Sequence, residues 1–154
     1  TPQNIVIGGA AGAFPPLVGW AAVTGSLDLM AVYLFLIIFY WTPPHFWALA
    51  LNKQQDYGNA GIPMAPLIWG EKETKRQMVW YSVVLIALTV LPWAMGALGL
   101  AYLVSALVLG AIFLWGALRV QFAADFVKPA WWLYAYSLLY LALLFAAMVV
   151  DRFI

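Results

Sequence analysis

Hydrophobic residues follow one another in long stretches that no charged side chain interrupts. These stretches cover residues 1–27, 29–52, 77–118 and 129–150. A bilayer core of roughly 30 Å is crossed by about 20 apolar residues in a helix, so each stretch can cross a membrane at least once. The third is long enough for two crossings, and Gly96 and Gly99 supply a turn between them because glycine readily adopts the backbone angles of tight connections.

This pattern predicts an all-α polytopic membrane protein with about five transmembrane helices in a single helical domain, residues 1–154. A β-barrel would instead show polar and apolar positions alternating in segments of about ten residues. No segment here alternates for that length. We expect the helices over about residues 5–23, 29–51, 78–97, 100–118 and 130–150.

The first predicted helix is rich in small residues. Gly8 and Gly12 form a small-xxx-small pair, which lets a neighbouring helix approach closely. We expect tight helix packing at these glycines. A smooth wall against a bulky lipid-like ligand is the alternative.

The composition agrees with a membrane location. Hydrophobic residues make up 66% of the chain and charged residues 8%, whereas soluble domains carry about 25% charged residues. Cysteine is absent, which excludes disulfides and thiolate metal sites. The chain begins at Thr1 without a visible signal peptide, so we expect it to be a fragment of a longer polytopic protein.

The basic residues indicate a topology. Six of the seven lie in the connections after the second and fourth predicted helices, and Arg152 alone lies on the other side. Short loops rich in Lys and Arg stay in the cytoplasm, so the 52–77 loop should face the cytoplasm or the mitochondrial matrix. The formal net charge of +1 gives no sign of nucleic-acid binding. The six residues are Lys53, Lys72, Lys75, Arg76, Arg119 and Lys128.

The only histidine, His45, lies at the basic end of the second predicted helix, in the segment WTPPHFWALALNKQQDY that begins at residue 41. If the helix resumes after the proline pair, then His45, Asn52 and Asp56 lie on one stripe. Ionisable groups in membrane spans are costly to bury, which favours a functional site. A hydrogen-bonded interfacial histidine is the alternative.

Near this stripe, the residue types suit a diphosphate and a prenyl group. A carboxylate such as Asp56 can hold Mg²⁺, which in turn binds phosphate oxygens, and departure of diphosphate from an allylic lipid leaves a carbocation that aromatic surfaces stabilise. The positive-inside rule and an interfacial aromatic belt explain the same residues without a site. The candidates are Lys53, Lys72, Lys75 and Arg76 for phosphate charge, and Tyr57, Trp41, Phe46 and Trp47 for the aromatic wall of a prenyl cavity.

Three segments carry a resemblance to a known family. They read TPQNIVIGGAAGAFPPLVGW, FYWTPPHFWALAL and DYGNAGIPMAPL, and together they resemble the carboxy-terminal half of the protoheme IX farnesyltransferase family, within the UbiA superfamily of intramembrane prenyltransferases. The resemblance implies a nine-helix bundle with about four helices before Thr1. It implies transfer of a farnesyl group from farnesyl diphosphate to a vinyl group of heme b, giving heme O, and little activity for this fragment alone.

The resemblance also implies roles for individual residues. The superfamily holds a Mg²⁺–diphosphate group between two polar loops, and its second motif, D-x-x-x-D, appears here as Asn52-x-x-x-Asp56. Asp56 is therefore the predicted metal ligand, and Asn52 and Lys53 lie beside the diphosphate. His45 of the PPHF motif is the candidate for engaging heme, as an iron ligand, through a propionate or as a base. The predicted catalytic residues are Asp56, His45, Lys53 and Tyr57.

Two other functions stay open. One is a non-catalytic membrane heme carrier or oxidase-assembly subunit, and the other is a prenyltransferase that acts on a quinone precursor. In the favoured interpretation heme b is a substrate, Mg²⁺ is the cofactor, and terminal-oxidase assembly proteins or heme A synthase are partners. The expected location is the bacterial cytoplasmic membrane or the mitochondrial inner membrane.

Overall fold

A computed structural model describes all residues from 1 to 154, and they form helices without any strand. Five helices are long and apolar enough to cross a membrane, as the hydrophobic pattern predicts, and two short ones lie between the second and third of these. The helices are α1 Asn4–Thr24, α2 Leu29–Asn52, α3 Gln54–Asn59, α4 Ala65–Ile68, α5 Glu71–Ala94, α6 Leu100–Phe122 and α7 Val127–Val150.

The ends of the helices follow local chemistry. The side chain of Asp28 caps α2 by accepting hydrogen bonds from the backbone N–H groups of Met30 and Ala31. Helix α5 begins at Glu71 rather than near residue 78, since acidic residues in its first turn complement the helix dipole. It ends at Ala94, just before Gly96 turns the chain with φ at 70°. Helices α6 and α7 also extend beyond the predicted ranges into the connection between them.

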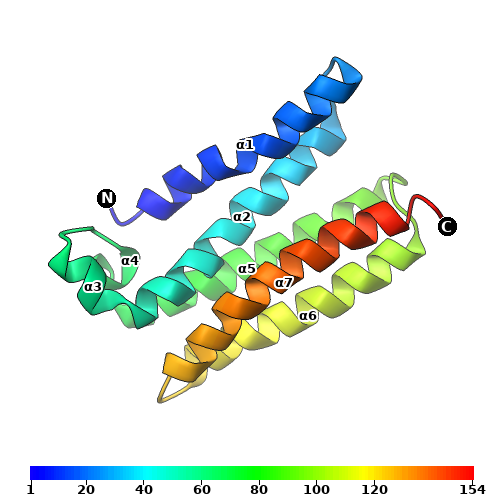
Figure 1. The fold of residues 1–154 in the computed structure, drawn as a ribbon. Coiled ribbons are helices and arrows are strands. Elements are labelled where there is room, and N and C mark those ends of the chain that lie inside the picture. Colours follow the sequence, from blue (N-terminus) through cyan, green and yellow to red (C-terminus); the bar gives the residue numbers. More distant parts are fainter.

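Successive long helices run antiparallel and pack side by side (Figure 1). Helices α2, α5, α6 and α7 close into a four-helix bundle because α7 returns to contact α2. Helix α1 lies along the outer edge of α2. The N-terminus, α3, α4 and the α6–α7 connection lie at one end, which we call the basic end, and the C-terminus lies at the other.

The contact between α1 and α2 depends on Gly9. A Cβ atom added at Gly9 would lie 3.1 Å from Thr42 of α2, so a side chain there would require Thr42 to move by a few tenths of an ångström. The predicted contacts at Gly8 and Gly12 are not made, since a Cβ atom at either would meet no atom within 4 Å. These two glycines line an open space between α1 and α2 instead, and the close approach occurs at Gly9.

Contacts between distant segments fix both ends of the bundle. At the C-terminal end, the carboxylate of Asp151 accepts hydrogen bonds from the N–H groups of Gly99 and Tyr102, which satisfies two free donors of α6. At the basic end, the connection before α4 is anchored by Met64, which is buried and whose sulfur lies 3.3 Å from the side-chain nitrogen of Asn4. The 52–77 segment is therefore held against the helices.

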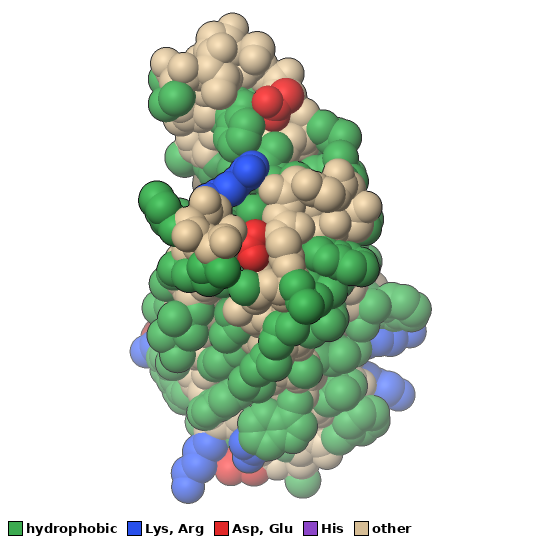
Figure 2. Space-filling model, turned by 90° about the vertical axis from the view of Figure 1, so that its right-hand side faces the viewer, with side chains coloured by type: hydrophobic (Ala, Val, Ile, Leu, Met, Phe, Trp, Pro, Cys, Tyr) green, Lys and Arg blue, Asp and Glu red, His purple; other side chains and the backbone are tan.

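The outside of the bundle is mainly apolar. Figure 2 shows hydrophobic side chains over most of the face in view, with a few Lys, Arg, Asp and Glu side chains among them and no histidine. Such a surface suits lipid contact rather than water, because monomeric soluble proteins rarely expose large continuous apolar patches. The fold is that of a polytopic helical membrane protein.

Candidate functional site

The imidazole of His45 lies in the interface between α2 and α7. The residue is only 5% exposed. Its ring stacks between two aromatic rings, with centroids 4.4 Å from Trp41 and 4.7 Å from Tyr134, and Phe46 meets it edge-on at 5.0 Å. The aromatic rings therefore restrict the imidazole on both faces and along one edge.

Ser137 of α7 is the hydrogen-bond partner of His45. The hydroxyl of Ser137 donates to the backbone carbonyl of Tyr134 at 2.6 Å, and the same oxygen lies 2.6 Å from Nδ1 of His45. When the serine hydroxyl donates to the carbonyl of Tyr134, Nδ1 is the donor in the second contact. The proton of the neutral imidazole is then on Nδ1, and Nε2 keeps its lone pair.

The free nitrogen of this imidazole defines what His45 can do chemically. Nε2 has no hydrogen-bond partner among residues 1–154. An unprotonated Nε2 can bind a metal such as heme iron or accept a proton, but it cannot donate a hydrogen bond to a carboxylate. The geometry therefore favours an iron ligand or a base over a contact with a heme propionate.

A cavity of about 360 Å³ lies beside His45, between α1 and α2. Trp41 and Phe46, which contact the imidazole, form part of its wall, and the glycine face of α1 forms the opposite part. Trp47, also predicted to line the site, is on the other side of α2, where it packs against Trp69 and Tyr81. Two of the three predicted aromatic residues are thus placed together with His45.

The predicted stripe from His45 to Asp56 is interrupted. Helix α2 continues through the proline pair and ends at Asn52, and Lys53 leaves the helical conformation with φ at −118° and ψ at 25°. Asp56 consequently belongs to α3, which has no buried residue. The prediction that His45, Asn52 and Asp56 share one continuous helical face was wrong, because a one-residue break reorients the chain.

Residues 52–57, on either side of this break, contain part of the predicted diphosphate site. The Nζ atom of Lys53 lies 3.1 Å from a carboxylate oxygen of Asp56, and their side chains are 46% and 67% exposed. Tyr57 follows in α3 and is half-buried. Both amide atoms of Asn52 are buried without a hydrogen-bond partner. A buried polar group without a partner costs about 1–3 kcal/mol, so the Asn52 amide is suited to a ligand or segment that would pair with it.

The other predicted phosphate-binding residues make no direct bond to Asp56. Lys72 and Arg76 line a separate pocket between α5 and α6, and the Nζ atom of Lys75 lies 3.7 Å above the ring of Phe126. None of the three forms a hydrogen bond or an ion pair with Lys53 or Asp56. The structure therefore divides the basic residues into two groups.

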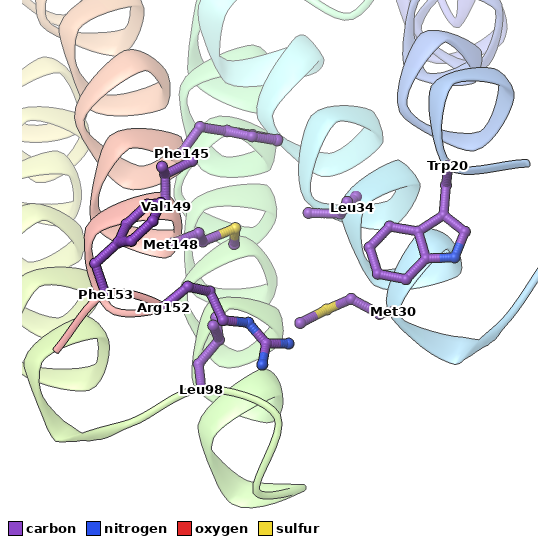
Figure 3. A pocket seen from close by; sticks show the side chains of 9 residues that line it. All are labelled: Trp20, Met30, Leu34, Leu98, Phe145, Met148, Val149, Arg152 and Phe153. Atoms are coloured by element: carbon purple, nitrogen blue, oxygen red, sulfur yellow. The ribbon is translucent and has the colours of Figure 1, made fainter. Parts of the chain in front are cut away.

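A second apolar cavity lies at the end of the bundle opposite His45. It measures about 380 Å³ and is lined by nine residues, eight of them hydrophobic. Figure 3 shows the Arg152 guanidinium projecting between α7 and α2, toward Met30. No group that the sequence singles out for chemistry lines this cavity.

Ser137 and Tyr134 are the site residues that the sequence did not reveal. Ser137 lies 92 positions after His45, in a helix whose other residues are almost all apolar. A single serine in an apolar helix is most often a residue that bonds its own backbone. Only the packing of α7 against α2 shows that this hydroxyl is shared with an imidazole.

Comparisons with known proteins agree with these features. A sequence model described as the UbiA prenyltransferase family matches residues 1–138. The protoheme IX farnesyltransferase of Chloroflexus aurantiacus is 60% identical over 154 residues, which is all of this chain and 26% of that protein. The corresponding protein of Roseiflexus sp. is 61% identical over 150 residues, covering 97% of this chain and 28% of that protein.

The protoheme IX farnesyltransferase of Erythrobacter litoralis is 56% identical over 158 residues, which cover 100% of this chain and 52% of that protein. The chain thus spans about half or less of the length of these curated relatives. No solved structure matches it.

Proposed function

Because the chain belongs to the UbiA prenyltransferase family, we propose that the protein containing it transfers a farnesyl group from farnesyl diphosphate to a vinyl group of heme b, giving heme O. Proteins named protoheme IX farnesyltransferase match the chain over its whole length. The structural observation that carries the choice of heme is His45, a buried imidazole whose Nε2 is left free. Residues 1–154 alone are not expected to be active.

Heme would lie against the aromatic wall beside His45. Neutral imidazole is a common axial ligand of heme iron, and the rings of Trp41 and Phe46 offer flat apolar surfaces to a porphyrin. We assign His45 as the iron ligand and rank its action as a base lower. The glycine face of α1, on the opposite side of the cavity, leaves space for a long apolar chain.

The diphosphate of the second substrate would lie at the segment from Asn52 to Tyr57. Lys53 can neutralise phosphate charge, and the amide of Asn52 has unused hydrogen-bonding capacity. The oxygen donors of Asp56 and Asn52 fit Mg²⁺, which typically takes one or two carboxylates and completes its shell with water and phosphate. Bound there, Mg²⁺ would supply positive charge that makes diphosphate a better leaving group.

The reaction balances without an external oxidant. The bond between C1 of the farnesyl group and the diphosphate oxygen breaks, and its electron pair leaves with the diphosphate. The π electrons of the heme vinyl group form the new carbon–carbon bond, and water adds to the remaining cationic carbon and loses a proton. Aromatic faces such as that of Trp41 stabilise the positive charge and exclude bulk water.

We also propose that the protein lies in a bacterial cytoplasmic membrane with the 52–77 segment on the cytoplasmic side. The long apolar helices support a multi-pass membrane protein. The placement of six basic residues at one end of the bundle supports this orientation. Heme O made there would pass to terminal-oxidase assembly proteins or to a heme A synthase.

The proposal is tested by incubating the full-length protein in membranes with heme b, farnesyl diphosphate and Mg²⁺. We expect a heme product whose mass has grown by a farnesyl group and one hydroxyl group. A stable heme complex without such a product would identify a carrier instead. Prenylation of a quinone precursor but not of heme would identify a different acceptor.

A further inference from the structure

The pocket between α5 and α6 has no part in the proposed reaction. It measures about 360 Å³, and Trp69, Lys72, Glu73, Arg76 and Gln121 line it. It lies at the basic end, on the side of the bundle away from α1. We propose that this pocket binds the headgroup of an anionic phospholipid, and we commit to phosphatidylglycerol as the occupant.

The exposed face of α5 continues from this pocket toward the middle of the membrane. Lys72, Arg76 and Trp80 are all exposed and follow one another at intervals of four residues, which places them on one face of the helix. Trp80 is 60% exposed and Val83, further along, is 41% exposed. A phosphate at the two cations would therefore have its acyl chains against the apolar continuation of the same face.

Two positive charges and one negative charge line the pocket, so its net charge is positive. Its single carboxylate, Glu73, already accepts hydrogen bonds from Arg76 at 2.8 Å and Gln77 at 2.7 Å. Lys72 forms no ion pair within the chain, and the side chain of Arg76 is 63% exposed. Both cations are thus accessible to a phosphate that carries a negative charge.

Gln121 provides a second, independent reason to expect a ligand in this pocket. Its Oε1 atom is buried and has no hydrogen-bond partner. A hydroxyl group on the ligand would satisfy this acceptor, and an unsatisfied buried acceptor is unfavourable. The headgroup of phosphatidylglycerol combines an anionic phosphate with a second glycerol that offers hydroxyl donors. Phosphatidic acid has the same phosphate but lacks this headgroup glycerol.

The surroundings of the pocket suit this occupant. Six basic and four acidic side chains lie at this end of the bundle, against one basic and two acidic at the other. Basic pockets between transmembrane helices on the cytoplasmic side bind anionic headgroups, and each basic residue near the surface raises affinity by roughly fivefold. Trp69 adds an interfacial indole, a side chain that prefers the depth of the headgroups.

The experiment measures which lipids the full-length protein retains. The protein is reconstituted in nanodiscs with equal amounts of phosphatidylglycerol and phosphatidylcholine. It is then released from the nanodiscs together with the lipids that it retains, and the complexes are analysed by native mass spectrometry. We expect preferential retention of phosphatidylglycerol, and an about 25-fold loss of that preference in the double variant Lys72→Gln/Arg76→Gln, about fivefold for each charge removed. Gln121→Leu should weaken retention of phosphatidylglycerol but leave retention of phosphatidic acid unchanged.

The matched control is Arg119→Gln/Lys128→Gln, which removes two charges from the same end but outside the pocket. This control should keep the lipid preference. If both double variants lose the preference for phosphatidylglycerol equally, the basic end attracts anionic lipids without a specific pocket, and the proposal is overturned. A wild-type protein that retains the two lipids equally would also overturn it. An increase in KM for farnesyl diphosphate in Lys72→Gln/Arg76→Gln, with lipid retention unchanged, would assign these cations to the substrate instead.

Discussion

At the scale of single residues, the site depends on how His45 is held. An imidazole in an apolar interface needs a hydrogen-bond partner, since a buried polar group without one is unfavourable. Ser137 provides it, and the backbone carbonyl of Tyr134 fixes the direction of the serine hydroxyl. Stacking of aromatic rings adds about 0.5–1.5 kcal/mol per pair. The result is an imidazole held in one restricted orientation.

This arrangement predicts that Ser137→Ala impairs the use of heme. Without the hydroxyl, Nδ1 loses its acceptor, and the proton can move to Nε2, where it blocks iron binding. Loss of such an orienting partner typically costs 10–100-fold in metal affinity, so we expect heme affinity to fall about tenfold, as measured by spectral titration. The KM for farnesyl diphosphate should not change.

Ser105→Ala is the matched control for Ser137→Ala, because the hydroxyl of Ser105 bonds only a carbonyl of its own helix. His45→Ala should remove the same heme signal completely. If Ser137→Ala binds heme as tightly as the wild-type protein, Ser137 has no role in setting the tautomer.

A second prediction at this scale concerns Asp56. Its carboxylate is exposed and is paired only with Lys53, so Asp56→Asn should leave the fold intact while removing the charge proposed to hold Mg²⁺. We expect turnover with farnesyl diphosphate to fall by about 100-fold, with a higher Mg²⁺ concentration required for half-maximal rate. Asp125→Asn is the control, since this exposed side chain accepts a hydrogen bond from the backbone N–H of Val127 and an amide oxygen can do the same. Unchanged turnover of Asp56→Asn would remove the residue from the site.

At the scale of helices, single residues decide where elements end and how closely they pack. Lys53 separates α2 from α3, which turns Asp56 away from the helical face that carries His45. Gly9 lets α1 approach Thr42 of α2. Only Gly9 and Ala13 of α1 are buried, so this one contact carries much of the packing between the two helices.

Gly9→Val should therefore separate α1 from α2. The new side chain would begin 3.1 Å from Thr42, and overpacking of this kind costs about 1–3 kcal/mol. We expect a lower midpoint of thermal unfolding in detergent. We also expect a weaker spectral change when heme is added, because the cavity beside Trp41 lies in the same interface. Gly19→Val makes the same change in helix propensity within α1 but meets no atom within 4 Å and lies outside this cavity, so it should resemble the wild-type protein. Equal stability of the two variants would show that the α1–α2 contact is not tight.

At the scale of the whole molecule, charge placement and antiparallel packing give one consistent topology. The α6–α7 connection and the 52–77 segment lie at the same end of the bundle, and the α1–α2 and α5–α6 connections lie at the other. Six basic residues gather at the first end. A membrane potential and anionic lipids both favour that end in the cytoplasm.

The topology can be tested directly because this chain contains no cysteine. Single cysteines at Lys128 and at Ser26 would lie at opposite ends of the bundle. In a full-length protein without other cysteines, a membrane-impermeant thiol reagent added to intact cells should label Ser26→Cys and leave Lys128→Cys unmodified until the cells are opened. The reverse pattern would place the Asp56 segment outside the cytoplasm.

The sequence by itself determined the class of protein, the number of membrane-crossing helices and the clustering of basic residues at one end. These properties follow from the hydrophobicity and charge of consecutive residues, which local sequence records directly. The PPHF segment also pointed to His45, because an ionisable group in an apolar span requires an explanation.

Only the tertiary structure decided how the site is assembled. The break at Lys53 depends on one residue's backbone angles, and the close contact falls at Gly9 rather than at Gly8 or Gly12 because α2 meets that face of α1. The bond between His45 and Ser137 joins helices whose pairing no local pattern encodes.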